Sequence, residues 1–491
     1  MVQTPAFDAA LALSRFGLGS GLSGTAAVSD ARAVLHDEIN AGAPVPQGDL
    51  QATPDLLTAV YQYQAQKRMD RKAAGDTTDK PDMQDGVQGD MKPDMQAGMT
   101  DDKPDAGGRK KRDPDLGASP VIKALFTEFD ARFNGTVKSP VIGFNERMAM
   151  FWFNHFAVSV KKSQPVAATA GAYEREAIRP HIFGKFHDML VAVETHPTML
   201  LYLDNAQSVG PQSLGAKFGK RGLNENLARE IFELHTLGVG TGYTQADVTS
   251  FARIITGWSV STGRKAFRNM GDPGTFAFND RIHEPGAQIV MGKTYAEGGQ
   301  AQGLAVLADL ARHPATAKHI ATMLARHFVA DDPPPALVAR LADTFTRTDG
   351  DLGEVSRALI SSDEAWSPQL VKIRSPLEYV CAVLRATGAP IKPKVVASVM
   401  NAMGEPLWQP PGPNGFPDTI DAWASPEGLS ARMDFISTLA QQASQDVDPR
   451  AFAQSRLGPL LSDATLQAIS RAETHAQGLS LAFLSPEFMR R

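Results

Sequence analysis

Residues 222–258 read GLNENLAREIFELHTLGVGTGYTQADVTSFARIITGW, a stretch that predicts two capped helices joined by a glycine-rich turn. Asn224 is a favourable N-cap residue, because its side chain can accept a hydrogen bond from a free backbone N–H of the first turn. Gly238 suits the left-handed position that follows a helix end. Thr244 and Asp247 have the spacing of a capping box, which predicts the start of the second helix.

With about 3.6 residues per turn, Leu227, Ile231 and Leu234 form one apolar stripe on the first of these helices. Glu230 falls inside this stripe, and His235 lies at its edge. An ionised carboxylate in apolar surroundings is costly unless another group pairs with it. We therefore expect Glu230 to have a partner, which is either a structural arginine or a metal ion or substrate.

The opposite face of the same helix carries Glu225, Arg229 and Glu233 at a spacing of four residues. This pattern predicts a ladder of exposed ion pairs. Asn226 lies near the start of the helix, and Trp258 ends the stretch. Both are candidate substrate-binding residues.

The composition is typical of a globular protein, because 43% of the 491 residues are hydrophobic. No apolar run reaches the length of about 18 residues that a membrane-spanning helix needs. The net charge of −5 argues against nucleic-acid binding. The single cysteine, Cys381, excludes an intrachain disulfide and a cysteine-cluster metal site. The N-terminus lacks the features of a signal peptide, so we expect a cytoplasmic protein, with export beside a partner as the alternative.

Helical periodicity dominates the chain, so we expect a mainly α fold: an irregular multi-helix globular bundle with one small β-hairpin and a disordered acidic insertion. The hairpin is predicted at residues 287–295, where two β-like runs flank a glycine. Outside residues 222–258, helices are expected at residues 5–15, 26–40, 55–68, 119–134, 145–160, 173–179, 183–195, 197–203, 302–311, 315–329, 335–347, 352–361, 376–386 and 395–403.

Residues 70–117 differ in composition from the rest of the chain. They are rich in Asp, Met and Lys-Pro pairs and contain no aromatic residue, so they bury too little apolar surface to become ordered. We therefore expect N-terminal helices in residues 1–69, a disordered insertion in residues 70–117, and a main helical domain in residues 118–491. The main domain is expected to pack with the N-terminal helices as one unit.

Residues 145–160, NERMAMFWFNHFAVSV, are apolar on nearly every side, which predicts a buried central helix. Asn154 and His155 lie within this helix and need hydrogen-bond partners if they are buried. His155 is either a satisfied core histidine or a ligand. Asn154 is a candidate substrate-binding residue.

Other polar candidates come from separate parts of the chain. His283 precedes the hairpin in a loop, where functional side chains are common. Asp204 follows a short helix and is either a turn residue or a substrate contact. His319 and His327 lie beside basic residues on one helix, which predicts a solvated face. Residues 404–426 are rich in Pro, Gly and aromatic residues and predict a loop that either plugs an edge of the core or binds a sugar or peptide.

Several segments together resemble the bacterial family known as domain of unknown function 1800. The resemblance covers residues 8–491 apart from the insertion. It implies a mostly helical protein and no established activity. The segments that carry it are Phe151–Ser159, Ile178–His181, His196–Asn205, Asn224–Gly238, Gly242–Asp247 and Thr256–Trp258.

The same resemblance bears on the candidate residues and on partners. Relatives often carry a second histidine where this chain has Phe153, which weakens a two-histidine ligand pair on that helix. Relatives commonly have Trp at the position of Phe416, which weakens a sugar platform there. Such proteins are often encoded beside a sulfatase-like protein and many carry export signals, which implies an envelope-associated role as an alternative.

Two functional hypotheses follow. In the first, the chain is a metal-dependent enzyme, hydrolytic or oxidative, that binds zinc, iron or manganese. Its catalytic residues are Glu230, as general base, and His155. Its metal ligands are His155, His235, His283 and Glu230. In the second hypothesis, the chain is a non-catalytic binding or assembly partner of the sulfatase-like protein.

Overall fold

The computed structural model describes residues 4–73, 119–139, 141–217, 219, 221–262, 271–390, 392–443 and 447–491. The predicted acidic insertion, from residue 74 to residue 117, lies outside the described residues. Residues 70–73, predicted to begin this insertion, belong to a helix instead.

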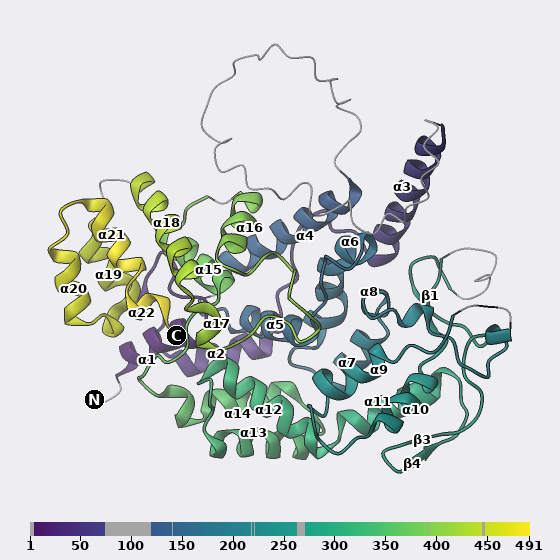
Figure 1. The fold of residues 1–491 in the computed structure, drawn as a ribbon. Helices are drawn as coiled ribbons and strands as arrows, with labels where there is room; N and C mark the ends of the chain where they lie inside the picture. Colours follow the sequence, from purple (N-terminus) through teal and green to yellow (C-terminus); the bar gives the residue numbers. More distant parts are fainter. Residues whose placement is uncertain are drawn as a thin grey trace.

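The prediction of a mainly α fold is confirmed by the helices of the described ranges (Figure 1). In the first half of the chain these are α1 (Pro5–Arg15), α2 (Ala31–Ala41), α3 (Thr53–Ala73), α4 (Pro120–Val137), α5 (Phe144–His155), α6 (Gln164–Tyr173), α7 (Phe186–Glu194), α8 (Pro197–Tyr202), α9 (Asn226–Glu230) and α10 (Gln245–Ile254). In the second half they are α11 (Gln300–Ala311), α12 (Pro314–Phe328), α13 (Pro335–Arg347), α14 (Leu352–Ser361), α15 (Pro376–Thr387), α16 (Pro393–Ala402), α17 (Ile420–Trp423), α18 (Pro426–Gln442), α19 (Pro449–Leu457), α20 (Asp463–Ser470), α21 (His475–Phe483) and α22 (Pro486–Met489).

α5 lies in the middle of the fold, between α4 and α6 on one side and α12 to α14 on the other (Figure 1). All of its residues except Met150 and Asn154 are buried, which confirms the predicted central helix. The helix is shorter than predicted, because it ends at His155. The chain then leaves the helix, and the backbone N–H of Val160 donates to the backbone oxygen of Trp408, 3.0 Å away.

α6 is absent from the predicted helices, although the sequence carries a signal for it. Ser163 caps the helix by accepting a hydrogen bond from the backbone N–H of Val166, and Pro165 lies in the first turn. Both features mark a helix start. The small residues that follow give no apolar periodicity, so the pattern is weak.

Within residues 222–258, the predicted features of the helix ends are confirmed. Asn224 Oδ1 accepts a hydrogen bond from the backbone N–H of Asn226, at 2.9 Å. Gly238 has a φ of 87°, the left-handed conformation expected after a helix. Thr244 and Asp247 form both bonds of the predicted capping box at the start of α10.

The predicted helical wheel fails after Glu230, because residues Ile231–His235 form a π-helix, η6. A π-helix has a wider turn than an α-helix, so side chains after Glu230 point in directions different from those of a 3.6-residue period. Leu234, expected in the apolar stripe, is only half-buried. His235, expected at the stripe's edge, is fully buried.

Two small antiparallel sheets accompany the helices of the described ranges. β3 (Gln288–Val290) and β4 (Lys293–Tyr295) form the predicted hairpin. Its two turn residues, Met291 and Gly292, have φ values of 48° and 77°, which fit the tight turn of a two-residue hairpin. β1 (Trp258–Val260) pairs with β2 (Phe276–Phe278) in a second sheet that the sequence pattern does not predict.

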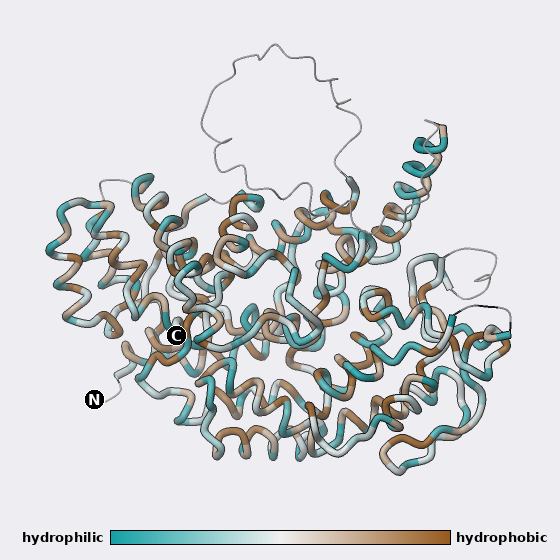
Figure 2. The backbone as a smooth tube through the Cα atoms, in the orientation of Figure 1, coloured by the Kyte–Doolittle hydropathy of each residue, from teal (hydrophilic) through white to brown (hydrophobic). Residues whose placement is uncertain are grey.

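A single apolar core contains residues from Ala9 to Phe488 and thus draws on both ends of the chain. α3 joins it only through its first two turns, and the rest of this helix projects from the body (Figure 1). The projecting end carries mostly hydrophilic residues, whereas the other helices alternate between hydrophilic and hydrophobic ones (Figure 2). In the described part of the chain, no helix is both long and apolar enough to cross a membrane.

A substitution at Gly303 in α11 can test how tightly this helix packs on β1. A Cβ atom at this position would clash with the buried ring of Trp258. We expect Gly303→Ala to lower the free energy of unfolding by about 1–3 kcal/mol, as measured by urea denaturation. Gly135 in α4 is the control, because a Cβ atom there meets nothing within 4 Å. Gly135→Ala should raise the free energy of unfolding by about 0.4–1 kcal/mol, and equal effects of the two substitutions would contradict this packing.

Candidate functional site

Two of the four predicted metal ligands lie together. His155 ends α5 and His235 ends η6, and their ring centroids are 6.3 Å apart. The Nε2 atom of His155 lies 3.3 Å from the backbone oxygen of His235. His235 Nδ1 lies 2.7 Å from Glu194 Oε1, and both of these side chains are fully buried. The sequence pattern did not indicate Glu194, whose carboxyl group contacts His235.

The other two predicted ligands have different surroundings. Glu230 ends α9 and is half-buried, and burial raises the pKa of its carboxyl group. An arginine, one of the two kinds of partner considered for Glu230, is not paired with it in the described residues, where Arg229 forms ion pairs with Glu225 and Glu233. His283 Nδ1 lies 2.9 Å from the backbone oxygen of Thr256, and its ring contacts Phe278. No hydrogen bond or ring contact between described residues joins His283 to His155.

Within the described ranges, no group of three or more His, Cys, Asp or Glu side chains is arranged to hold a metal ion. His155, His235, His283 and Glu230 thus do not form a ready-made metal site. Their binding of zinc, iron or manganese stays a prediction.

Three of the predicted substrate-binding residues, Asp204, Trp258 and Asn226, lie outside the pocket described below. Asp204 has a φ of 60° and forms an ion pair of 2.5 Å with Lys162. Trp258 is fully buried in β1. Asn226 is exposed at the start of α9. Their role in substrate binding stays a prediction.

The pocket lies where residues 404–426, the proline-rich loop, cross α5 and the start of α15. Its cavity volume is about 90 Å³. Its apolar lining includes Phe153 from α5 and Trp408, Phe416 and Trp423 from the proline-rich loop. Its polar lining residues are Arg132, Asn154, His327, Ser375, Glu378, Glu405 and Asp418.

Asn154 holds the proline-rich loop against α5. Its Nδ2 atom donates to the backbone oxygen of Phe416 at 2.9 Å, and its Oδ1 atom accepts from the backbone N–H of Phe416 at 2.8 Å. The preceding residue, Gly415, has a φ of 74°, and a Cβ atom there would clash with the backbone oxygen of Asn154. Asn154 thus lines the pocket, but its amide group is already hydrogen-bonded to the proline-rich loop.

Glu405 is a buried carboxyl group in the pocket wall, three residues after the end of α16. Its Oε2 atom accepts a hydrogen bond from the backbone N–H of Leu377, at 2.8 Å. Burial is the main cause that raises the pKa of Glu405 to about 7, and repulsion from Glu378 acts in the same direction. The hydrogen bonds from Leu377 and Ser375 oppose the rise. Glu405 therefore changes its charge near neutral pH.

His327 is neutral in this environment, because burial lowers its pKa to about 4. Its Nε2 atom lies 3.0 Å from Arg147 Nη2, and its Nδ1 atom lies 2.6 Å from Asp418 Oδ2. An arginine only donates, so Nε2 accepts and the ring proton is on Nδ1, which donates to Asp418. The solvated face predicted for His327 and His319 is wrong, because both side chains are half-buried and make contacts inside the fold.

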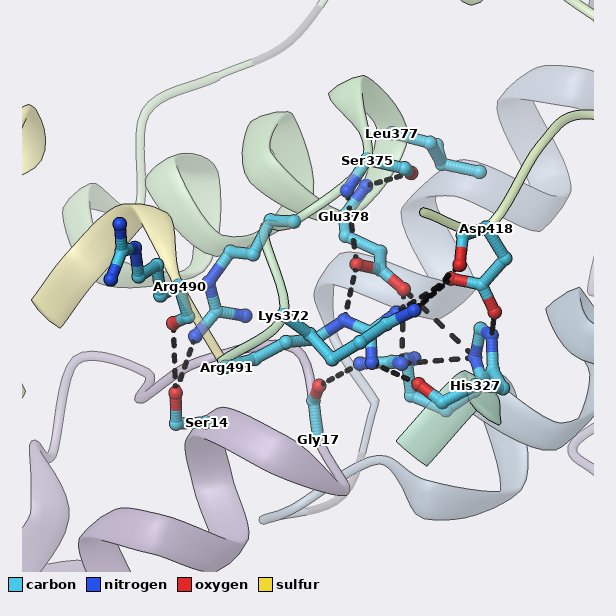
Figure 3. A network of polar contacts seen from close by, with 12 residues as sticks. Ser14, Gly17, His327, Lys372, Ser375, Leu377, Glu378, Asp418, Arg490 and Arg491 are labelled. Atoms are coloured by element: carbon cyan, nitrogen blue, oxygen red, sulfur yellow. Dashed lines mark hydrogen bonds and ion pairs between the residues drawn. The ribbon is translucent and has the colours of Figure 1, made fainter. Parts of the chain in front are cut away.

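A network of buried charges connects His327 to both ends of the chain (Figure 3). Arg147 Nη2 lies 2.9 Å from Glu378 Oε1, and Arg491 Nε lies 2.8 Å from Glu378 Oε2. Although burial opposes the ionised form, these two guanidinium groups lower the pKa of Glu378 to about 2. Lys372 Nζ lies 3.1 Å from Asp418 Oδ1. Both pocket carboxylates of this network are thus held in the ionised form.

Comparison with known proteins places the whole chain in one family. A family model described as "Protein of unknown function (DUF1800)" matches residues 12–490. The chain belongs to this family. The resemblance noted in the sequence is thereby confirmed, and so is its implication of a mostly helical fold. No curated protein and no solved structure matches the chain.

The pocket of this family member contains residues that sequence reasoning missed. Glu405, Glu378 and Asp418 lie in segments with no catalytic motif, and His327 was expected on the surface. The available signal was the proline-rich loop itself, because an aromatic loop with acidic residues at positions 405 and 418 is typical of a pocket wall. The sequence alone does not show that this loop packs against α5 and α15.

Asn154→Ala tests the attachment of the proline-rich loop to α5. The substitution leaves the two backbone groups of Phe416 without their partners, so we expect the free energy of unfolding to fall by about 1–3 kcal/mol. Limited proteolysis should also cut within residues 404–426 sooner than in the wild type. Asn226→Ala, at an exposed position, is the control and should stay within about 0.5 kcal/mol of the wild type. Unchanged cleavage in Asn154→Ala would refute the attachment.

The pKa of Glu405 predicts a pH-dependent stability. Between its ordinary value of 4.5 and its folded value of about 7, the folded protein keeps a proton that the unfolded chain releases. Stability therefore falls as pH rises through this window and stays reduced above it. Glu405→Gln removes this loss, so the variant should gain up to roughly 3 kcal/mol on the wild type between about pH 5 and pH 8.

Urea unfolding of wild type and Glu405→Gln across that pH range measures the difference. Glu427→Gln, in the exposed first turn of α18, is the matched control and should show no such window. A constant difference between Glu405→Gln and wild type from pH 5 to pH 8 would show that Glu405 titrates in its ordinary range.

Proposed function

We propose that this chain is an enzyme that binds a small, largely apolar molecule in the pocket and exchanges a proton with it through Glu405. The observation that carries the proposal is a buried carboxyl group whose pKa is about 7, in the wall of a pocket lined by aromatic side chains. A group that titrates near the working pH is suited to act as general acid and general base. Perturbed carboxyl groups in pockets are a common mark of active sites.

The other ionisable groups of the pocket are less suited to this role. Glu378 stays ionised at neutral pH because its pKa is about 2. Asp418 also stays ionised, because contacts with His327, Arg491 and Lys372 lower its pKa against the effect of burial. His327 already uses both ring nitrogens. Glu405 is left as the pocket group that can take up and release a proton.

The lining indicates what kind of molecule the pocket accepts. Trp408, Phe416 and Trp423 provide flat apolar surface, while the charges of Glu378 and Asp418 are already compensated by buried cations. An uncharged apolar or aromatic group fits this environment better than a strongly charged one. The substrate then needs one polar, proton-bearing group within reach of Glu405.

Trp408 adds a further indication that the pocket has a purpose beyond stability. It has a φ of 49°, a conformation that is unfavourable for a residue with a large side chain. Its indole N–H is buried and forms no hydrogen bond within the described structure. Strained residues and unpaired buried donors concentrate at functional sites, where the surrounding structure maintains them.

The two hypotheses drawn from the sequence locate the function outside this pocket. A metal-dependent reaction at Glu230 and His155 requires a group of side chains arranged to bind the metal ion. No such group is present among the described residues. An assembly role beside a sulfatase-like protein rests on the family resemblance. The aromatic docking surface that would support it is not present at Trp408 or Trp423, because both side chains are buried.

An enzyme activity assay tests the proposal. Purified protein is assayed against a panel of uncharged chromogenic acyl, glycosyl and phosphoryl esters with aromatic leaving groups. We expect turnover of at least one class, with an inflection near pH 7 in the rate profile. Glu405→Gln should reduce the rate by about 10²–10⁴-fold, and Glu427→Gln should leave it unchanged. Turnover that Glu405→Gln retains with the same pH profile would exclude Glu405 as the acid–base group.

A further inference from the structure

Three imidazole rings from distant parts of the chain lie near the C-terminal end of α5. They belong to His155 in α5, His235 in η6 and His319 in α12. The ring centroid of His155 lies 6.3 Å from that of His235 and 6.0 Å from that of His319. This histidine cluster lies apart from the pocket, since none of the three residues lines it.

Each ring of the cluster has one nitrogen within hydrogen-bond distance of a backbone or carboxyl oxygen. His155 Nε2 contacts the backbone oxygen of His235, at 3.3 Å. His319 Nε2 contacts the backbone oxygen of Leu234, at 3.1 Å. His235 Nδ1 contacts Glu194 Oε1, at 2.7 Å. These contacts place a proton on the contacting nitrogen, so in a neutral ring the second nitrogen carries a lone pair.

The second nitrogen of His235, its Nε2 atom, is buried and has no partner among the described residues. The residue as a whole is also fully buried. A buried polar atom without a partner is costly, so the fold retains His235 Nε2 at the expense of stability.

The contacts are those that hold metal-binding histidines. Such a histidine nearly always donates its other ring N–H to a carboxylate or a backbone carbonyl, which fixes the ring and strengthens the ligand. Glu194 provides the carboxylate for His235, and backbone carbonyls serve the other two rings. The π-helix η6, which brings His235 into the interior, is a kind of distortion that recurs at functional sites.

We propose that His155, His235 and His319 bind one divalent transition-metal ion of the zinc class, with Glu194 as the acceptor that orients His235. Three imidazoles on one tetrahedral zinc ion, each bound at about 2.1 Å, have ring centroids roughly 5 Å apart. The observed spacings of 6.0 and 6.3 Å are somewhat larger. The described residues hold no ready-made metal-binding group, so the ion draws the rings together by small side-chain rotations.

This site differs from the one expected from the sequence. His319 replaces His283, whose Nδ1 contacts Thr256 in a separate loop. His319 is half-buried, which leaves the ion a way in.

The test is a metal titration of the full chain after removal of bound metal with a chelator. We expect one Co²⁺ ion per chain, with the strong visible absorption of a tetrahedral nitrogen site, and displacement of Co²⁺ by Zn²⁺. Glu194→Gln, which preserves side-chain shape, should weaken binding by about 10–100-fold. His319→Ala should weaken it further. His187→Ala, a histidine outside the cluster, is the control and should bind as the wild type does.

Circular dichroism and the unfolding midpoint establish that each variant is folded, and Glu194→Gln keeps the test decisive if His319→Ala does not fold. Absence of saturable Co²⁺ binding by the wild type overturns the proposal. Binding that is equally tight in Glu194→Gln and wild type also overturns it. Glu405→Gln should bind the ion normally, so failure of this site leaves the acid–base proposal for the pocket intact.

Discussion

The buried ion pair between Arg147 and Glu378 is the constraint on which the rest of the structure depends. Arg147 has no exposed surface, so loss of its partner would leave a charge stranded in the interior, at a cost that far exceeds that of a surface pair. The same guanidinium group donates to the backbone oxygen of Gly17, and Arg491 binds the other carboxylate oxygen of Glu378. Segments from both ends of the chain therefore converge on α5, and the pocket wall is built on this junction.

Two helices each contribute to both sites. On α5, Asn154 faces the proline-rich loop while the next residue, His155, belongs to the histidine cluster. On α12, His327 contacts the network under the pocket and His319 lies eight residues earlier. Eight residues correspond to about 12 Å along a helix. A change in how α5 and α12 pack would consequently alter the pocket and the cluster together, because no flexible segment separates them.

What the sequence predicts well is local. The capping box at Thr244, the left-handed Gly238 and the hairpin turn at Met291 depend on neighbours within a few residues, and all three are present. The helical wheel around Glu230 fails where the backbone changes to a π-helix, which no residue pattern in η6 announces. The pocket was missed for a different reason. Glu405 becomes unusual only when the fold buries it against the start of α15, and that contact has no counterpart in the linear order of residues.

The amide of Asn154 and the backbone of Phe416 are separated by 262 positions along the chain. Contacts between such distant residues close a very large loop, and the entropy of that closure delays them relative to helix formation and local pairing. The pocket therefore comes into existence among the last steps of folding. Any molecule that occupies the pocket therefore binds only the fully folded protein. Its binding shifts the equilibrium from partly folded molecules toward fully folded ones.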